Sequence, residues 1–346
     1  MKTALVTTTI NVPEVLRLYR ACDPDVMFFI MGDRRTPDEK VVDFLHDIPN
    51  HAYYGIDTQH KLGYASSRLI GENTIGRRSI AILEALRWGA ELIVTIDDDN
   101  IPLSTDYFAQ FKRAIENPFS GVGAVGGVGT WFDPGKLQFP TDGIDPVCQR
   151  GFPPGRVSWS EYRGVAGVRV GVAQGMILGD PDTSAIDRIS RHPDVHQVSE
   201  LLRAGLVTNP NEQWAPLNSQ NLAFTRELAP CFLLPPQWKR QDDIWAGLIA
   251  QRVMRERDLH VYYGQPFVYQ QRNTHNLVSD LENEMLGMKH TAEFATFLER
   301  TRLSENGSVI EHTGTIYREA SGLKFMPAGV LELAGAWLSD VTKVLG

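Results

Sequence analysis

Residues 93–100, with the sequence IVTIDDDN, constrain the fold of this chain more than any other stretch. Apolar and β-branched residues, which favour a strand, lead directly into Asp97, Asp98 and Asp99. Three adjacent carboxylates repel one another, and core packing gives no reason to place them at the end of a buried strand. A divalent cation removes the conflict, because carboxylate oxygens are ligands that Mg²⁺ and Mn²⁺ prefer. A solvated acidic turn that caps the next segment is the alternative.

The spacing within the triplet also matters. Successive side chains of a strand point to opposite faces, so we expect Asp97 and Asp99 to point the same way and Asp98 to point elsewhere. A strand followed by Asp-x-Asp is the pattern with which metal-dependent nucleotide-sugar enzymes hold a diphosphate. The pattern therefore predicts Asp97 and Asp99 as metal ligands.

The first hundred residues alternate strand and helix patterns, which is typical of an open parallel sheet flanked by helices. We expect strands at 3–8, 25–31 and 91–96, and helices at 12–22, 38–47 and 79–88. Ligands of such sheets lie beyond the carboxyl ends of the strands. Thr8, Thr9 and Asp33, which follow the first two strands, are therefore candidates for holding the base and ribose of a nucleotide. Strand-end capping is the alternative for the threonines.

The second half of the chain gives a less regular pattern. Residues 118–215 are rich in glycine and proline, and the segment VGAVGGVG (122–129) within them indicates either a flexible strand or a loop on the acceptor side of a site. A strand is expected at 167–178 and a helix at 241–256, with further helices near 278–303 and 329–344. No clean domain boundary is visible.

Composition narrows the class of protein. A formal net charge of -8 over 346 residues argues against broad nucleic-acid binding. No apolar run approaches the ~20 residues of a membrane helix, and the first ten residues indicate a strand rather than a signal peptide. Three widely spaced cysteines fit a reducing compartment. We therefore expect a cytoplasmic protein without a membrane span, and the sequence leaves open whether it forms a homo-oligomer.

Several motifs, in order along the chain, resemble known families. VTTTINVP, GDRRTP, GRRSIAILEAL, DDDN and YQQRNTHNL are similar to STELLO-type glycosyltransferases. Four further motifs are similar to the reversibly glycosylated polypeptides (UDP-arabinopyranose mutases): RGFP (150–153), GMILGDPD (175–182), NLAFTREL (221–228) and QDDIWAGLIAQ (241–251). Together these motifs span about residues 4 to 300, and the last 45 or so carry none.

The resemblance implies an α/β fold of the GT-A type, Rossmann-like, with a mostly parallel central sheet flanked by helices. It implies a domain over residues 1–305, with a nucleotide-binding half at 1–117 and a half for acceptor and donor sugar at 118–305. Residues 306–346 would form a C-terminal helical extension.

The function implied is a metal-dependent glycosyltransferase that uses Mn²⁺ or Mg²⁺. It would transfer a sugar from a UDP-linked or other nucleotide-linked donor to a small-molecule or glycan acceptor. A nucleotide-sugar pyranose/furanose mutase is the alternative, although Val165 occupies the position of the family's glycosylated arginine, with Arg163 and Arg169 offset from it. A non-catalytic GT-A-like scaffold is a further alternative.

The resemblance also assigns roles to individual residues. Asp242 and Asp243 match the acidic pair that many GT-A enzymes place beside the acceptor. We expect Asp243 to be the general base, against the alternative that both are helix N-terminal charges. The remaining candidates are Asp98 for the sugar or ribose, Arg77 (favoured over Arg78) for the pyrophosphate, Asn221 for the donor sugar, Arg272 for the diphosphate and His275 as third metal ligand.

Overall fold

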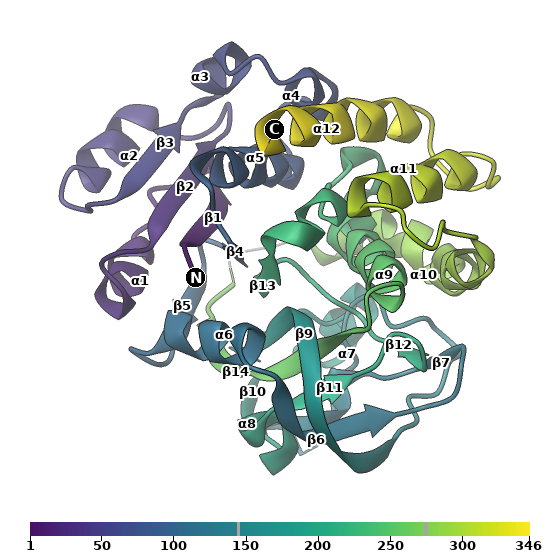
Figure 1. Cartoon of the computed structure of the whole chain (residues 1–346). Coiled ribbons are helices and arrows are strands. Elements are labelled where there is room, and N and C mark those ends of the chain that lie inside the picture. Colours follow the sequence, from purple (N-terminus) through teal and green to yellow (C-terminus); the bar gives the residue numbers. More distant parts are fainter. Residues whose placement is uncertain (144–145, 273–275) are drawn as a thin grey trace.

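The computed structural model describes residues 1–143, 146–272 and 276–346. A large mixed sheet forms the centre of the molecule, with helices around it (Figure 1). The first part of the sheet is parallel, in the order β3-β2-β1-β4. These strands are β1 (Thr3–Thr9), β2 (Met27–Gly32), β3 (His51–Tyr54) and β4 (Leu92–Ile96). The expected strands are confirmed within one to two residues at each end.

Side-chain alternation along these strands builds two hydrophobic layers. On β2, Phe28 and Ile30 belong to one core cluster, whereas Phe29 and Met31 belong to the other. Because both faces of the parallel part are covered, its strands are continuously apolar rather than alternating with polar residues.

The second part of the sheet is mainly antiparallel. β13 (Asn221–Thr225) joins β4 in antiparallel orientation and continues to the long β9 (Glu161–Gly179). β9 pairs with β6 (Phe119–Val125) and with β14 (Leu259–Gln270), and β11 (Leu206–Thr208) bridges these two. The lower part of Figure 1 shows these four strands together. Beyond β4 the pairs β6–β11 and β9–β14 are parallel, whereas β4–β13, β13–β9, β9–β6 and β11–β14 are antiparallel, as is the pair of β14 with β5 (Asn100–Pro102). The sheet is therefore mixed, and the expectation of a mostly parallel sheet holds for its first part.

The remaining strands are short and lie at the margins. They are β5 (Asn100–Pro102), β7 (Thr130–Trp131), β8 (Gln138–Pro140), β10 (Val195–Val198) and β12 (Gln213–Trp214). β5 pairs with the end of β14, which brings the segment after β4 next to Gln270.

Helices cover both layers. They are α1 (Leu16–Cys22), α2 (Asp38–Leu45), α3 (Ile56–Lys61), α4 (Ala65–Ile70), α5 (Arg78–Trp88), α6 (Tyr107–Glu116), α7 (Ala185–Arg191), α8 (Glu200–Ala204), α9 (Asp242–Arg255), α10 (Leu277–Arg300), α11 (Val309–Ala320) and α12 (Val330–Leu345). Short 3₁₀ segments are η1 (Ile75–Arg77), η2 (Pro134–Leu137), η3 (Arg226–Cys231) and η4 (Pro236–Gln241). The expected helices do not include α3, α4, α6, α7, α8 or α11.

Helices α5 and α9 are central rather than amphipathic surface helices. Residues Arg78–Leu86 of α5 and Asp242–Met254 of α9 are buried. Their first residues carry charge, so the fold places buried ionic groups at the starts of both helices. Those two starts face the carboxyl end of β4, where the site described below is built.

The C-terminal helices are integrated into the core (Figure 1). In α12, Asp340 accepts hydrogen bonds from the Ser66 backbone and hydroxyl (both 2.8 Å) and from the Ala65 amide (3.2 Å). Trp337 is fully buried and donates to the carbonyl of Pro230 (2.8 Å). The hydrophobic core is therefore continuous across residue 305.

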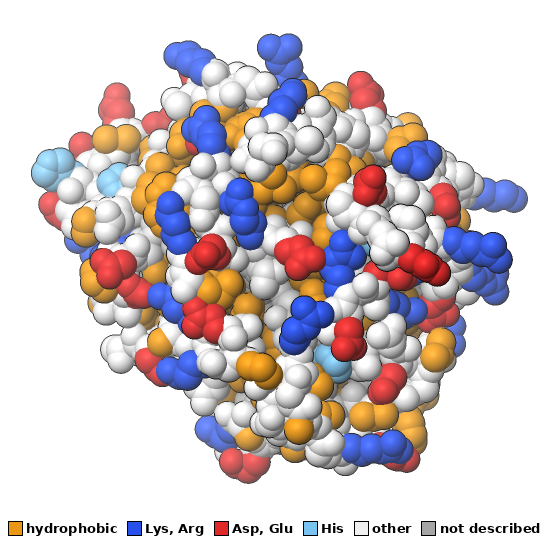
Figure 2. All heavy atoms as spheres, viewed as in Figure 1, with side chains coloured by type: hydrophobic (Ala, Val, Ile, Leu, Met, Phe, Trp, Pro, Cys, Tyr) orange, Lys and Arg blue, Asp and Glu red, His pale blue; other side chains and the backbone are white. Residues whose placement is uncertain are grey.

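None of the described helices is both long and apolar enough to cross a membrane. On the face shown in Figure 2, acidic and basic side chains are intermingled around a hydrophobic area in the upper middle. Charges of both signs are thus interspersed on this face rather than gathered by sign.

Candidate functional site

The acidic triplet forms a tight turn between β4 and β5. The Asn100 amide donates to the carbonyl of Asp97 (3.2 Å), which closes the turn. Asp97 and Asp99 both line a hollow of about 410 Å³ at the start of α9, and Asp98 does not. The expectation that Asp97 and Asp99 share a direction is consistent with this placement, but a turn rather than strand alternation produces it.

A second hollow, of about 330 Å³, lies beyond the ends of β1 and β2. We call it the β1 hollow, and the first one the α9 hollow. The β1 hollow is lined by Thr8, Thr9, Ile10, Asp33, Arg35, Asn73, Thr74, Ile75, Arg78, Asp97, Asp98 and Asp99. The two hollows share Asn73, Thr74, Ile75, Asp97 and Asp99, so they meet at the triplet.

Thr9, Asp33 and Asp98 shape the β1 hollow. The Thr9 hydroxyl donates to Asp98 Oδ2 at 2.5 Å. The Asp33 carboxylate accepts the backbone amides of Asn73 (2.7 Å) and Thr74 (2.9 Å), and so holds the loop that borders both hollows. Burial raises the pKa of Asp98. The structure brings these residues together beside the triplet, although Asp33 already uses both oxygens for the backbone.

Of the two adjacent arginines, the structure brings Arg78 and not Arg77 to the triplet. The buried Arg77 guanidinium donates to Gln59 (2.7 Å) and to the carbonyl and hydroxyl of Ser67 (2.8 and 2.9 Å), outside both hollows. Arg78 is equally buried, and its Nη2 lies 2.5 Å from Asp97 Oδ1. The sequence favoured Arg77 for the pyrophosphate, and the structure places Arg78 beside the triplet instead. One residue of offset on a helix turns the side chain by about 100°.

Asp243, at the start of α9, is held by donors on both oxygens. Oδ1 accepts from Arg150 Nη1 (3.1 Å) and from the Ile244 amide (2.9 Å). Oδ2 accepts from Arg150 Nη2 (3.1 Å) and from the amide and hydroxyl of Ser219 (3.0 and 3.3 Å). Five donors fix this carboxylate and hold it in place.

Asp242 has a different environment. Its Oδ1 accepts the Asp243 amide (2.9 Å), whereas its Oδ2 is buried without a hydrogen-bond partner among the described residues. The residue is 4% exposed and lines the α9 hollow together with Asp97 and Asp99. Burial, reinforced by the charge of Asp243, raises the pKa of Asp242 to about 7. Such a carboxyl group can both accept and donate a proton near neutral pH.

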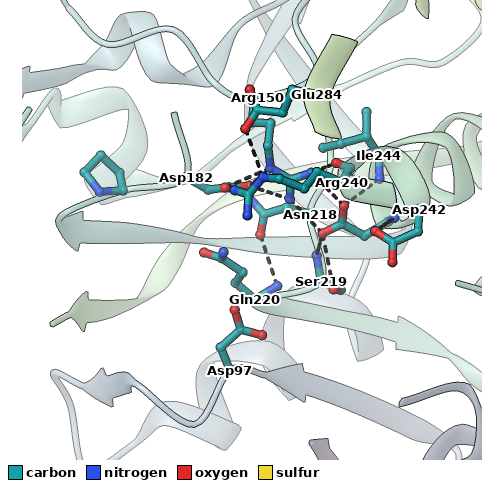
Figure 3. A network of polar contacts seen from close by, with 12 residues as sticks. Asp97, Arg150, Asp182, Asn218, Ser219, Gln220, Arg240, Asp242, Ile244 and Glu284 are labelled. Carbon is teal, nitrogen blue, oxygen red and sulfur yellow. Dashed lines mark hydrogen bonds and ion pairs between the residues drawn. The ribbon is translucent and has the colours of Figure 1, made fainter. Parts of the chain in front are cut away.

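Arg150 ties three distant segments together (Figure 3). Besides Asp243, its guanidinium contacts both oxygens of Asp182, with Nε at 2.9 and 3.1 Å and Nη2 at 2.9 Å. Burial alone would raise the pKa of Asp182, but Arg150 holds it below its ordinary value. The motifs RGFP, GMILGDPD and QDDIW therefore meet in one buried ion network. All three motifs are visible in the sequence, but the candidate site residues predicted from it do not include Arg150. Its position within the motif RGFP was the signal that could have identified it.

Arg272 and Gln270 border the triplet from the end of β14. Gln270 Nε2 lies 3.3 and 3.4 Å from the two oxygens of Asp99, and Arg272 Nη2 donates to Gln270 Oε1 (3.0 Å). Burial, followed by the charge of Asp97, raises the pKa of Asp99 to about 6. Arg272 thus lines the α9 hollow, where it also forms an ion pair with Asp180 (3.5 Å), and its expected contact with a diphosphate stays a prediction.

Asn221 is fully buried away from both hollows. Its side chain accepts from the Tyr107 hydroxyl (2.6 Å) and donates to the carbonyl of Pro266 (2.9 Å), so the amide joins β13 to its surroundings. His275, the candidate third metal ligand, lies outside the described residues.

The donors around the triplet suit a cation that is shared with a phosphate ligand. Mg²⁺ is usually held by one or two carboxylates together with substrate phosphates and water, not by an all-protein cage. Asp97 and Asp99 supply two carboxylates to one hollow, and the raised pKa of Asp99 reflects charge that a cation would offset. In the described part of the chain, no group of three His, Cys, Asp or Glu side chains forms a complete metal cage.

Comparison with known proteins gives a family match. The family model described as reversibly glycosylated polypeptide matches residues 127–320. This range includes Arg150, Asp182, Asp242 and Asp243 but not the acidic triplet. The match therefore covers the α9 side of the site.

Two curated relatives come from Arabidopsis thaliana. Probable UDP-arabinopyranose mutase 5 is 24% identical over 239 residues, which cover 63% of this chain and 61% of the relative. Probable UDP-arabinopyranose mutase 4 is 29% identical over 227 residues, which cover 62% of this chain and 56% of the relative. The chain thus spans about three fifths of the length of the curated relatives it matches.

Proposed function

Because the chain belongs to the reversibly glycosylated polypeptide family, we propose that it is an enzyme of nucleotide sugars, and specifically a mutase that interconverts pyranose and furanose forms of a UDP-linked sugar. The names of both relatives support this reaction class. The sequence motifs alone favoured a glycosyltransferase and kept the mutase as the alternative. The family match reverses that order.

The two hollows suit the two ends of a nucleotide sugar. The proposal places the nucleoside in the β1 hollow, the diphosphate at the triplet and the sugar in the α9 hollow. The order β3-β2-β1-β4, with the triplet at the carboxyl end of β4, supports a GT-A-type donor site. Asp97 and Asp99 would hold Mg²⁺ or Mn²⁺, which when bound would neutralise charge on the leaving diphosphate.

One observation carries the proposal: among the described residues, Asp242 Oδ2 is buried without a hydrogen-bond partner in the hollow that Asp97 and Asp99 also line. Converting one ring form to the other exchanges the ring oxygen, so one hydroxyl loses a proton while another oxygen gains one. A carboxyl group with a pKa of about 7 can accept the first proton and return the second. Asp242, rather than Asp243, is therefore our candidate for proton transfer.

Asp243 has a positioning role in this scheme. Its contacts with Arg150 and Ser219 fix the start of α9, and its negative charge helps to keep the pKa of Asp242 high. A scaffold without catalysis has no use for an unpaired buried carboxylate, because burying such a group is costly. The Asp242 environment therefore favours an enzyme over a scaffold.

A glycosyltransferase is the second candidate function, because the arginine that becomes glycosylated in the family is absent from its position in this chain. Val165 occupies the position of the family's glycosylated arginine, and the neighbouring Arg163 and Arg169 lie on β9 outside both hollows. Arg163 is exposed and paired with Glu161 (2.5 Å). Both reactions begin by breaking the bond between the anomeric carbon and the diphosphate, whose oxygen keeps the electron pair. In a transferase the attacking hydroxyl belongs to a separate acceptor.

Incubation with a panel of nucleotide sugars and Mn²⁺ separates the two reactions. A mutase yields an isomerised donor and no net release of nucleoside diphosphate, whereas a transferase releases the diphosphate when an acceptor is present. Asp242→Asn is the matched variant and should abolish the isomerisation. Absence of both products across the panel would contradict an enzymatic function.

A further inference from the structure

Lys239 has an unusual backbone for a residue that lines the site. It lies in η4 with φ 54° and ψ -128°, a conformation that glycine tolerates and that costs other residues free energy. Its side chain is exposed and borders the α9 hollow. Strain of this kind persists only where the surrounding structure enforces it, and it concentrates at ligand-binding sites.

The neighbours of Lys239 enforce its conformation. Trp238 is fully buried and stacks on Tyr317, with ring centroids 5.7 Å apart. On the other side, Arg240 is paired with Glu284 (3.0 Å), and its carbonyl accepts a short hydrogen bond from Arg150. Because both neighbours are anchored in the interior, the chain must reverse at position 239. The reversal leaves the lysine side chain at the rim of the hollow.

Lys239 differs in its ion pairing from the other cations of the α9 hollow. Arg150 is paired with Asp182 and Asp243, Arg240 with Asp280 and Glu284, and Arg272 with Asp180. Among the described residues, the Lys239 ammonium has neither an ion pair nor a hydrogen bond. It is therefore the cation in this hollow whose charge is available to a ligand.

We infer that Lys239 binds the terminal phosphate of a nucleoside diphosphate held at the acidic triplet. This inference rests on the proposed function and adds a residue that distinguishes a nucleoside diphosphate from a nucleoside monophosphate. Lys239 borders the α9 hollow but not the β1 hollow, whereas Asp97 and Asp99 border both. A phosphate next to the nucleoside lies on the β1 side of the triplet, and the terminal phosphate lies on the α9 side. An ammonium suits this role because it acts as a compact charge with three donors.

The test uses three variants of the full chain and calorimetry with UDP, UMP and pyrophosphate in the presence of Mn²⁺. Lys239→Gln removes the charge and keeps the strained backbone, Lys239→Gly removes both, and Lys239→Arg keeps the charge. We expect the Gln and Gly variants to bind UDP about 10-fold more weakly, with UMP affinity unchanged and the Arg variant near wild type. The Gly variant should also melt about 1–3 °C higher, because the strain is relieved.

Two control variants isolate the two properties. His192→Gly relaxes another positive-φ residue (φ 45°), and Lys289→Gln removes another lysine charge; neither residue lines a hollow that includes the triplet. Both controls should bind UDP like wild type. A loss of UDP affinity in these controls equal to that in the Lys239 variants would overturn the inference.

The outcomes separate this inference from the proposed function. If wild type binds UDP and Lys239→Gln binds it with the same affinity, the role of Lys239 is refuted and the proposed function stands. An equal loss for UMP and UDP would also refute it, because the contact would not be with the terminal phosphate. If wild type binds pyrophosphate but not UDP, the function fails, and a Gln variant that loses pyrophosphate supports the phosphate site. Wild type that binds neither probe overturns both.

Discussion

Replacing Asp242 by asparagine should stabilise the protein at alkaline pH while it strongly lowers turnover. The Asp242 carboxyl is buried, and one of its oxygens has no hydrogen-bond partner in the part of the chain that the structure describes. Burial and the charge of Asp243 raise its pKa to about 7. An unfolded aspartate titrates near 3.9, so keeping this group ionised in the folded chain at pH 8 costs up to about 4 kcal/mol. Asparagine keeps an acceptor for the Asp243 amide and removes the charge.

The net gain should be smaller than that limit, because a buried amide group without a partner costs about 1–3 kcal/mol. We expect Asp242→Asn to be more stable than wild type by about 1–3 kcal/mol at pH 8. For a chain of 346 residues this corresponds to a rise in Tm of about 2–4 °C. Turnover should fall by about 10²–10⁴-fold if Asp242 transfers the proton.

The stabilisation by Asp242→Asn should depend on pH, and the direction of this dependence follows from the pKa of Asp242. Because the folded pKa lies above the unfolded one, the stability that Asp242 contributes is fully present below about pH 3.9 and is lost as pH rises through 7. Wild type therefore gains stability between pH 8 and pH 5, and the variant lacks this gain. The difference in Tm should shrink towards zero at pH 5.

Asp243→Asn is the matched control, and we expect it to lower the stability of the protein instead of raising it. It leaves Arg150 with one carboxylate instead of two, and removing a partner from a buried ion pair costs about 3–5 kcal/mol. Thermal melts of both variants at pH 5 and pH 8 measure these effects. A lower Tm for Asp242→Asn at pH 8, or a difference in Tm that does not change with pH, would refute the reasoning about the unpaired carboxylate.

Three further predictions concern other parts of the molecule. Calorimetry should show that UDP binds much more tightly with Mn²⁺ than with EDTA, and that Asp99→Ala removes the difference; equal affinities in wild type would exclude metal-linked binding. Intact-mass spectrometry after incubation with donor should show no sugar on the protein, because Arg163 and Arg169 lie outside both hollows, and a pentose or hexose adduct on β9 would contradict this. Asp340→Ala should lower stability by about 1–3 kcal/mol in thermal melts, since Ser66 loses its buried acceptor, and an unchanged Tm would show that α12 does not depend on this contact.

The family motifs were visible in the sequence, but their geometry was not. RGFP, GMILGDPD and QDDIW could be recognised as segments, and their meeting through Arg150 depends on how β9, α9 and the loop before β9 pack. Periodicity could also not distinguish Asp242 from Asp243. Both begin the same helix, and only the donors that surround each one, Arg150 and Ser219 on Asp243, make their roles different.

The sequence by itself determined the parallel strands of the first half and the position of the acidic triplet at the end of β4, because hydrophobic runs and turn residues are local signals. It also gave the grouping of Thr9, Asp33 and Asp98, since the ends of parallel strands meet at one edge. Tertiary structure alone decided that Arg78 rather than Arg77 reaches Asp97, and that the second half of the sheet mixes antiparallel with parallel pairs. These outcomes depend on long-range packing, in which partners far apart in the chain compete for the same buried space.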